Sequence, residues 1–227
     1  METVGILGTG RMAVRIADLL VQGGHEVWLG SRDPARAQRI AQGLSEGRVR
    51  GVTYAQAMQA PFVLPAIFVR DGLLELIGEH ADALAGKIVL DILNPFNADY
   101  SDFVLPWTTS AGEELAKRLP ESRVVGIFKN IFWEAFDEPR FPQGVSDVYV
   151  TGDDTQAKEA AMALFQEAPF RFVDAGGQRN ARVVERMTLF AAELGSRNGY
   201  MPRVGWRFLG EPWEPGVKDR YAHLIRR

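Results

Sequence analysis

Residues 3–13 read TVGILGTGRMA, a short apolar run followed by the pattern Gly-x-Gly-x-x-Ala. A run as apolar as Thr3–Leu7 is typical of a strand that a parallel sheet buries on both faces. After it, Gly8 permits a tight turn, Gly10 lets a diphosphate approach the backbone, and Ala13 allows the next helix to pack closely on the strand. The unpaired N–H groups at the start of that helix favour an anion. The stretch predicts a dinucleotide site, and the alternative is a structural turn that has lost its ligand.

Predicted strands and helices alternate along the following residues, which indicates a parallel, doubly wound sheet. Apolar runs predict further strands at Glu26–Leu29, Val49–Val52, Phe62–Phe68, Lys87–Leu90 and Arg123–Phe128. Spacing or composition predicts helices at Met12–Val21, Pro34–Leu44, Tyr54–Met58, Gly72–Leu84 and Ser110–Leu119. Pro65 is awkward inside its strand, because proline cannot donate a ladder hydrogen bond. The predicted fold class is α/β, with a Rossmann-type doubly wound parallel sheet.

The pattern changes near residue 142. We therefore expect residues 1–142 to form a dinucleotide-binding Rossmann domain and residues 143–227 a smaller C-terminal α/β domain. The second unit is expected to hold two strands and two helices: Val148–Val150, Asp154–Glu167, Arg171–Val173 and Arg179–Arg197. From residue 197 onward, seven Arg or Lys stand against three Asp or Glu, which makes a basic tail. The long helix carries an apolar stripe that suits either a homodimer seam or intrachain core, formed by Val183, Met187, Phe190 and Leu194.

The composition excludes several classes of protein. The 227 residues contain no cysteine, which excludes disulfides, thiolate metal sites and thiol nucleophiles, and three histidines leave little material for a zinc site. The 26 basic and 29 acidic residues give a net charge of −3, which argues against a nucleic-acid partner. No apolar run approaches the length of a membrane span, and the first residues enter a strand rather than a signal peptide. We expect a soluble cytoplasmic protein without a membrane partner.

The end of the second predicted strand indicates which dinucleotide binds. Sites specific for NAD carry an acid there, which accepts hydrogen bonds from the ribose hydroxyls. Here the strand runs into Ser31 and Arg32, whose hydroxyl and guanidinium groups can donate to the 2′-phosphate of NADP(H). Asp33, directly before Pro34, is predicted to cap the next helix. The cofactor predicted is NADP(H), and the alternative makes Arg32 a solvated surface charge.

Few groups suited to acid–base chemistry fall where the nicotinamide is expected, beyond the carboxyl ends of the fourth and fifth strands. None of the histidines is placed there. The residues that are placed there or at the next strand end are Ala66, Ile67, Phe68, Leu93, Asn94, Pro95, Phe128, Lys129 and Asn130. This mainly apolar set suits a hydride acceptor that handles its own protons better than it suits a carbonyl substrate. Lys129 is the candidate acid or base, or else a solvated lysine or a phosphate contact.

Asp153 and Asp154 look like a pair of metal ligands in the sequence. They follow a predicted strand and open a predicted helix, a position at which aspartate usually caps the helix. We therefore predict a helix cap here and no metal site.

Several short motifs follow one another along the chain in a consistent order. They are Trp28–Arg32, Val124–Phe128, Val150–Asp154, Val173–Gly176, Asn180-x-Arg182-x-Val184-Glu185, Asn198-Gly199 and Gly205–Leu209. The series, which extends from Thr3 to about Leu209, resembles the coenzyme F-420-dependent NADP reductases. Two further segments, Ala66–Phe68 and Ser110–Glu113, are also similar to the cytosolic NADPH-oxidoreductase domains of the STEAP metalloreductases.

The resemblance implies that NADP(H) contacts the glycine turn and the second strand end, with the nicotinamide near Ala66 and Asn94 and a deazaflavin stacked over it. The cofactor site predicted in this way comprises Gly8, Thr9, Gly10, Arg11, Met12, Ser31, Arg32, Ala66, Ile67 and Asn94. Asn94 and Lys129 are the predicted catalytic residues. Because both partners would be hydride carriers, the main task of the protein would be to align two flat rings. Basic residues are expected to steer the anionic tail of the deazaflavin, namely Arg179, Arg182, Arg197, Arg203 and Arg207.

Three functions are compatible with these features. The first is an NADP(H)-dependent oxidoreductase that exchanges hydride with a small-molecule carrier, coenzyme F-420. The second keeps NADPH and replaces the deazaflavin by a flavin or another small acceptor. The third is a non-catalytic NADP(H) sensor whose smaller domain binds a partner. Imine, pyrroline-carboxylate and hydroxyacid reductases share the first domain, but they usually need a longer helical second domain than the remaining residues can form.

Overall fold

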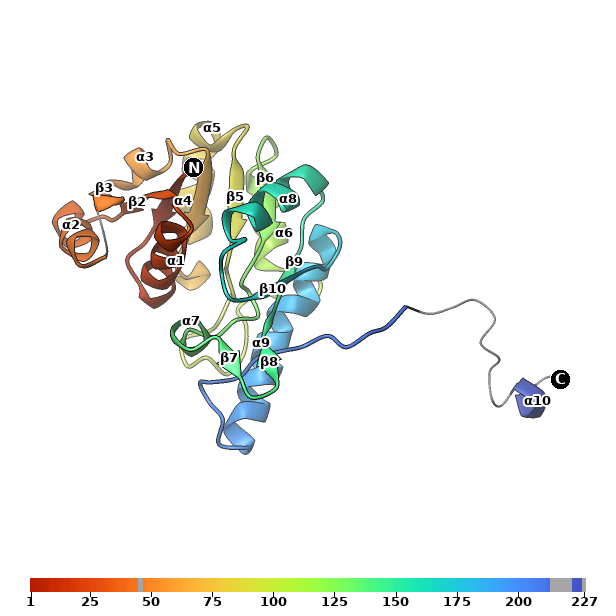
Figure 1. The fold of residues 1–227 in the computed structure, drawn as a ribbon. Coiled ribbons are helices and arrows are strands. Elements are labelled where there is room, and N and C mark those ends of the chain that lie inside the picture. The colour runs from red at the N-terminus through yellow and green to blue at the C-terminus, as the bar shows by residue number, and fades with distance from the viewer. Residues whose placement is uncertain (45–46, 213–221, 226–227) are drawn as a thin grey trace.

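The computed structural model describes residues 1–44, 47–212 and 222–225, and at its centre lies a six-stranded parallel sheet (Figure 1). The strands are β1 (Thr3–Leu7), β2 (Glu26–Gly30), β3 (Val49–Val52), β4 (Phe62–Pro65), β5 (Ile88–Asp91) and β6 (Arg123–Gly126). They lie in the order β3-β2-β1-β4-β5-β6. This order confirms the predicted Rossmann-type fold, and it makes the crevice beyond the carboxyl ends of β1 and β4 the place where such sheets bind ligands.

Helices cover both faces of the sheet, so that the central strands β1, β4 and β5 are buried on two sides. One face packs against α1 (Arg11–Gln22), α2 (Pro34–Gly43) and α8 (Thr155–Leu164). The other face packs against α3 (Tyr54–Ala57), α4 (Leu73–Glu79), α5 (Ala81–Leu84) and α6 (Ala111–Arg118). Burial on two sides explains why these three strands read as continuous apolar runs in the sequence.

Several predicted elements have different bounds in the structure. The strand β4 ends at Pro65 rather than at Phe68, because proline has no N–H with which to continue the ladder. The strand β6 ends at Gly126 rather than at Phe128, whose φ of +56° is left-handed and turns the chain out of the sheet. The single helix predicted at Gly72–Leu84 is two helices, α4 and α5, which meet at His80.

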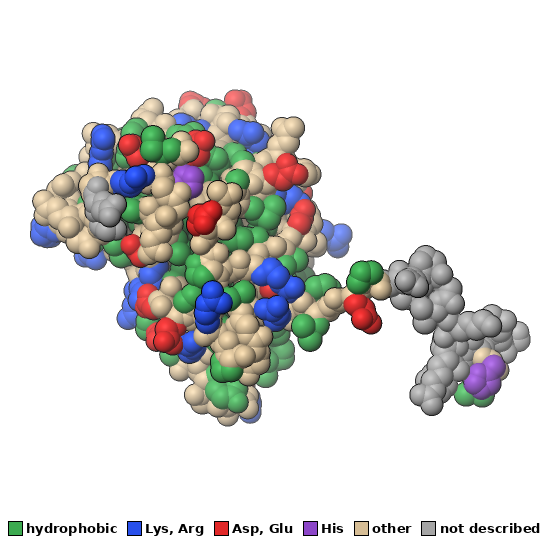
Figure 2. Space-filling model, in the orientation of Figure 1, with side chains coloured by type: hydrophobic (Ala, Val, Ile, Leu, Met, Phe, Trp, Pro, Cys, Tyr) green, Lys and Arg blue, Asp and Glu red, His purple; other side chains and the backbone are tan. Residues whose placement is uncertain are grey.

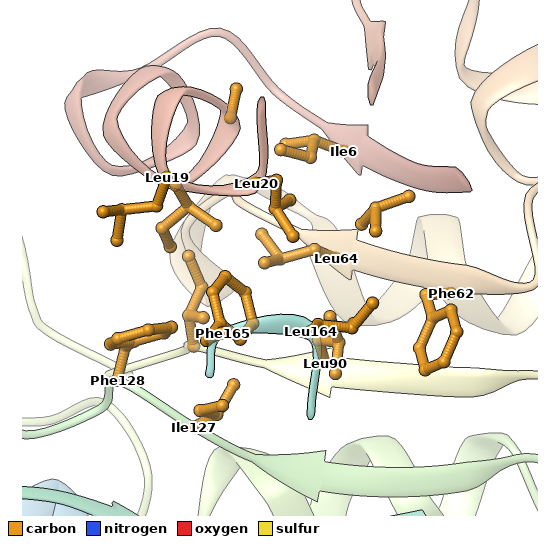
Figure 3. Close-up of a cluster of buried hydrophobic side chains, with 14 of the residues drawn as sticks. Ile6, Leu19, Leu20, Phe62, Leu64, Leu90, Ile127, Phe128, Leu164 and Phe165 are labelled. Atoms are coloured by element: carbon orange, nitrogen blue, oxygen red, sulfur yellow. The ribbon is translucent and has the colours of Figure 1, made fainter. Parts of the chain in front are cut away.

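The residues after β6 form a smaller layer that shares the core of the sheet. Its elements are α7 (Glu134–Asp137), β7 (Arg140–Phe141), β8 (Gly144–Val145), β9 (Asp147–Val150), β10 (Arg171–Asp174) and α9 (Ala181–Arg197). Figure 3 shows Leu164 and Phe165, at the end of α8, among Leu20, Leu64 and Leu90 of the sheet and its first helix. One hydrophobic cluster therefore crosses residue 142, and the division into two domains at that point stays a prediction.

Three short helices complete the described chain: η2 (Val69–Asp71), η3 (Gln178–Asn180) and α10 (Ala222–Ile225). No helix within the described ranges is long and apolar enough to cross a membrane. Four members of the predicted basic tail lie outside the described residues, namely Lys218, Arg220, Arg226 and Arg227.

Candidate functional site

The glycine turn between β1 and α1 has the geometry that an anion needs. Gly8 has φ +127°, and a Cβ there would lie 2.6 Å from the carbonyl oxygen of Ala66, so only glycine fits where β1 and β4 end side by side. Gly10 is the N-cap of α1, and it supplies no side-chain cap for the N–H groups of the first turn, which contains no acidic residue. A Cβ on Gly10 would meet no atom within 4 Å. Open space over uncapped N–H groups fits the diphosphate of a dinucleotide.

Replacing Gly10 with alanine tests whether this space receives the diphosphate. Gly10 has φ −83°, which alanine adopts readily, so the melting temperature should not fall. The added methyl would occupy the space over the turn and should weaken NADPH binding about tenfold, toward the lower end of overpacking costs. Gly78→Ala, where a Cβ also meets nothing within 4 Å, is the matched control. An unchanged dissociation constant in Gly10→Ala, measured by calorimetry, would contradict this role.

Arg11, the first residue of α1, is held by an aromatic ring from across the crevice. Its guanidinium carbon lies 5.1 Å from the centre of the Trp133 ring, and that of Arg15 lies 5.0 Å from the same ring. The Arg15 Nε also donates to Asp137 Oδ1 at 2.9 Å. These contacts tie the segment before α7 to the glycine turn and restrict where the Arg11 charge can lie. Nothing in the sequence around Trp133 indicates this role, because the pairing joins distant parts of the chain.

The end of β2 offers hydroxyl and guanidinium groups, as predicted. Ser31 is 8% exposed, and its Oγ accepts a hydrogen bond from Asp33 N at 3.1 Å. Asp33 Oδ1 in turn accepts from Arg36 N at 3.1 Å, which confirms that this carboxylate caps α2. The Arg32 side chain is exposed and lies beside Tyr54. Burial raises the pKa of the Tyr54 phenol, and the nearby positive charge of Arg32 partly offsets that rise. The geometry suits a 2′-phosphate better than it suits two ribose hydroxyls.

The expected nicotinamide end brings the ends of β4 and β5 together. Ala66 donates its N–H to Leu7 O at 2.8 Å, and Ala66 and Ile67 are both partly exposed. Asn94 Nδ2 donates to the carbonyl oxygen of Lys129 at 2.7 Å. The carbonyl oxygen of Lys129 is an acceptor, so the amide nitrogen of Asn94 faces it; the amide oxygen, Oδ1, is buried and has no hydrogen-bond partner among the described residues. An orphaned buried acceptor beside an apolar edge fits a donor such as the carboxamide of a nicotinamide.

Lys129 is fully buried inside an ion network, so the interpretation as a solvated lysine is wrong. Its Nζ lies 2.6 Å from Leu93 O, 2.6 Å from Asp91 Oδ2 and 2.9 Å from Glu185 Oε1, and all three charged side chains are 0% exposed. Burial lowers the pKa of the Lys129 ammonium, but the two carboxylates outweigh it and raise that pKa overall. Burial also raises the pKa of Glu185, with the neighbouring Asp91 adding to the rise. A lysine held in this way stays protonated and positions its neighbours.

The network connects the nicotinamide end to α6 and α9. Glu185, on α9, accepts hydrogen bonds from the N–H groups of Ala111 at 3.1 Å and of the following glycine at 3.3 Å, at the start of α6. Thr188, one turn further along α9, donates through Oγ1 to Lys129 O at 2.8 Å. That carbonyl oxygen is the same one that orients Asn94. The direct catalytic role predicted for Lys129 stays a prediction, whereas its contacts are those of a positioning residue.

The arginines expected to steer an anionic tail are largely engaged within the chain. Arg182 donates to both oxygens of Glu113 at 2.7 and 2.5 Å, and Arg203 pairs with Glu138. Acidic and basic side chains are interspersed over the face of the molecule drawn in Figure 2. Steering by these arginines therefore stays a prediction.

At the start of α8, Asp154 Oδ1 accepts a hydrogen bond from the third helical N–H at 2.8 Å, which confirms the predicted helix cap.

The fold and the glycine turn define the class of protein as a Rossmann-type α/β protein. Residues 3–95 match the sequence model of the family described as "NADP oxidoreductase coenzyme F-420-dependent". The F-420-dependent NADP reductase of Methanothermobacter marburgensis is 28% identical over 211 residues, which are 87% of this chain and 94% of that protein. Metalloreductase STEAP3 of Rattus norvegicus is 33% identical over 188 residues, which are 82% of this chain and 36% of that protein. The chain thus spans about a third of the length of the metalloreductase.

Solved structures agree with these likenesses. The crystal structure of a candidate F-420-dependent NADP-reductase from Arthrobacter sp. FB24 superposes with a TM-score of 0.74 at 28% identity, over 88% of this chain and 95% of that one. An imine reductase from Bacillus cereus superposes with a TM-score of 0.59 at 15% identity, over 88% of this chain and 64% of that one, which shows the fold alone. The resemblance to F-420-dependent NADP reductases and to STEAP metalloreductases is confirmed, and it supports NADP-linked oxidoreduction.

Proposed function

We propose that this protein transfers hydride between NADP(H) and a deazaflavin carrier of the coenzyme F-420 type. The observation that carries the proposal is the open, uncapped turn at Gly10 beside Ser31 and Arg32, a combination suited to a dinucleotide with a 2′-phosphate. The names of the relatives, F-420-dependent NADP reductases, support the choice of acceptor.

The residues of the chain would bind and orient the cofactor rather than transfer protons. NADPH, when bound, supplies the hydride. The glycine turn would hold its diphosphate, Arg32 its 2′-phosphate, and Asn94 Oδ1 its carboxamide. The partly exposed Ala66 and Ile67 would pack against the nicotinamide and limit the access of water to one face.

The same end of the site supports an acceptor that is itself a hydride carrier. Lys129, the candidate acid or base, is 0% exposed and ion-paired. The overall reaction, NADPH plus oxidised carrier plus H⁺ giving NADP⁺ plus reduced carrier, balances without an acidic side chain because water can supply the proton. The contribution of the protein would then be approach and alignment of two rings at about 3–3.5 Å.

Turnover in the presence of different acceptors tests this proposal. Protein, NADPH and oxidised F-420 are mixed, and we expect the absorbance band of the deazaflavin to bleach as NADPH is consumed. The same assay with FMN or FAD separates an F-420 enzyme from a flavin reductase. Binding of NADPH without reduction of any of the three acceptors would contradict the enzymatic proposal and favour the sensor.

We also propose that the protein is a homodimer joined along α9. Three of the four members of the predicted stripe are exposed in the described part of the chain, since Val183, Phe190 and Leu194 are 63%, 56% and 39% exposed, and this exposure favours the seam over intrachain core. Phe190 also lines a hollow of about 670 Å³ that includes Trp107, which is 75% exposed. A second copy would cover these apolar groups. A Phe190→Glu variant should sediment as a monomer; identical sedimentation of the variant and the wild type would contradict the proposed dimer seam.

A cytoplasmic location stays a prediction from the composition.

A further inference from the structure

A cluster of aromatic rings lies directly beside the expected nicotinamide end. Phe68 follows Ala66 by two residues after β4, and Phe96 follows Asn94 by two residues after β5. The ring of Tyr100 lies 5.9 Å from that of Phe68 and 5.5 Å from that of Phe96, measured between ring centroids. The loop after β5 therefore folds back toward the end of β4 and brings these rings to the edge of the site.

One guanidinium fixes this arrangement. The central carbon of Arg70 lies 4.0 Å from the centre of the Phe68 ring and 4.8 Å from that of Tyr100. Its Nη1 donates to Phe96 O at 2.9 Å and to Asn97 O at 2.7 Å, and its Nη2 donates to Tyr100 Oη at 3.1 Å. A guanidinium has five N–H donors, so these three bonds leave two for another acceptor. Arg70 thus holds the two rings and keeps a positive charge between them.

The two rings are more exposed than structural aromatic residues need to be. Phe68 is 38% exposed and Tyr100 is 52% exposed. Tyr100 also has φ +62°, a left-handed conformation that is costly for a tyrosine. Neighbouring exposed aromatic groups and local backbone strain are both features of binding surfaces.

We propose that Phe68 and Tyr100, held by Arg70, form a corner that binds the ring system of the acceptor and that we call the platform. The two rings lie at 74° to each other, so one can stack on the acceptor while the other meets its edge. The ligand class that fits is a flat aromatic redox carrier with an acidic substituent, whose charge Arg70 would pair. This inference rests on the proposed function, since it places the acceptor next to the nicotinamide.

Equilibrium binding tests the platform separately from turnover. Oxidised F-420, FMN and riboflavin are titrated into protein saturated with NADP⁺, and binding is followed by the fluorescence of each ring system. For Tyr100→Ala we expect the dissociation constant of F-420 or FMN to rise roughly three- to tenfold, the range of one aromatic contact. Tyr100→Phe should bind as the wild type does. Tyr200→Ala is the matched control, because Tyr200 is 65% exposed and lies after α9. The affinity for NADP⁺ should stay unchanged in all three variants.

The charge of Arg70 is tested by the difference between FMN and riboflavin, which lacks the phosphate. Arg70→Gln should weaken FMN binding several-fold more than riboflavin binding. Equal losses for the two ligands would overturn the acidic substituent, and unchanged acceptor binding in Tyr100→Ala would overturn the platform. Failure of the wild-type protein to bind any of the three ligands would also overturn the platform. Binding without turnover would contradict the proposed function while the platform stands.

Discussion

Lys129→Met is expected to lower the free energy of unfolding by about 3–5 kcal/mol, the cost of removing one partner from a buried ion pair. The methionine would fill most of the volume but would leave Asp91 and Glu185 as buried carboxylates without their cation. The carbonyl oxygen of Leu93 would also lose its 2.6 Å contact with Nζ. The measurement is chemical unfolding followed by circular dichroism, with equal m-values required for the comparison.

Two further variants separate this effect from the loss of any lysine. Lys117→Met removes a lysine whose side chain is 63% exposed in a surface pair with Glu114, and it should change the free energy of unfolding by less than about 1 kcal/mol. Adding Glu185→Gln to Lys129→Met removes one uncompensated charge and should restore part of the stability. If Lys129→Met were as stable as Lys117→Met, the buried ion pairs of Lys129 would not stabilise the fold.

Arg32→Glu is expected to weaken NADPH binding roughly ten- to a hundredfold and to leave NADH binding nearly unchanged. Loss of charge-assisted hydrogen bonds to the 2′-phosphate costs about 1.5–3 kcal/mol, and the new carboxylate would repel that phosphate in addition. NADH has a hydroxyl at this position, so the same change removes nothing comparable. Calorimetric titration of both nucleotides into both proteins measures the difference.

A matched control guards against a general effect of charge. Arg39→Glu makes the same change on the exposed surface of α2, and it should alter the affinities for the two nucleotides little and equally. Equal losses of NADPH and NADH affinity in Arg32→Glu would show that Arg32 does not recognise the 2′-phosphate.

Local features of the fold could be predicted from the sequence because local chemistry determines them. The strand at Thr3–Leu7 is found with the predicted bounds, since an apolar run before a glycine turn has few alternatives. Asp33 caps α2 as predicted, because a cap depends on neighbours within three residues. The end of β6 could not be predicted, since the left-handed φ of Phe128 accompanies packing against Phe165 and Phe170 from a later part of the chain.

The candidate site could be predicted in part. The glycine turn and the Ser31-Arg32 pair were recognisable because their chemistry resides in adjacent residues. The buried environment of Lys129 could not be predicted, because its partner Glu185 lies 56 residues away in the sequence and the Leu93 carbonyl lies 36 residues away. Burial of a lysine depends on such distant partners, and hydropathy alone favours a solvated side chain. Glu185 belongs to the motif Asn180-x-Arg182-x-Val184-Glu185, but nothing in its spacing indicates an ion pair.

Recognition of NADPH by the turn at Gly10 is the central claim, and calorimetric titration combined with thermal unfolding tests it most directly. One NADPH per chain should bind with measurable heat, and NADPH at a hundredfold excess over its dissociation constant should stabilise the fold by about 2.7 kcal/mol. For a chain of this size that corresponds to a rise in melting temperature of roughly 5–10 °C. No heat and no rise at saturating NADPH would contradict the claim.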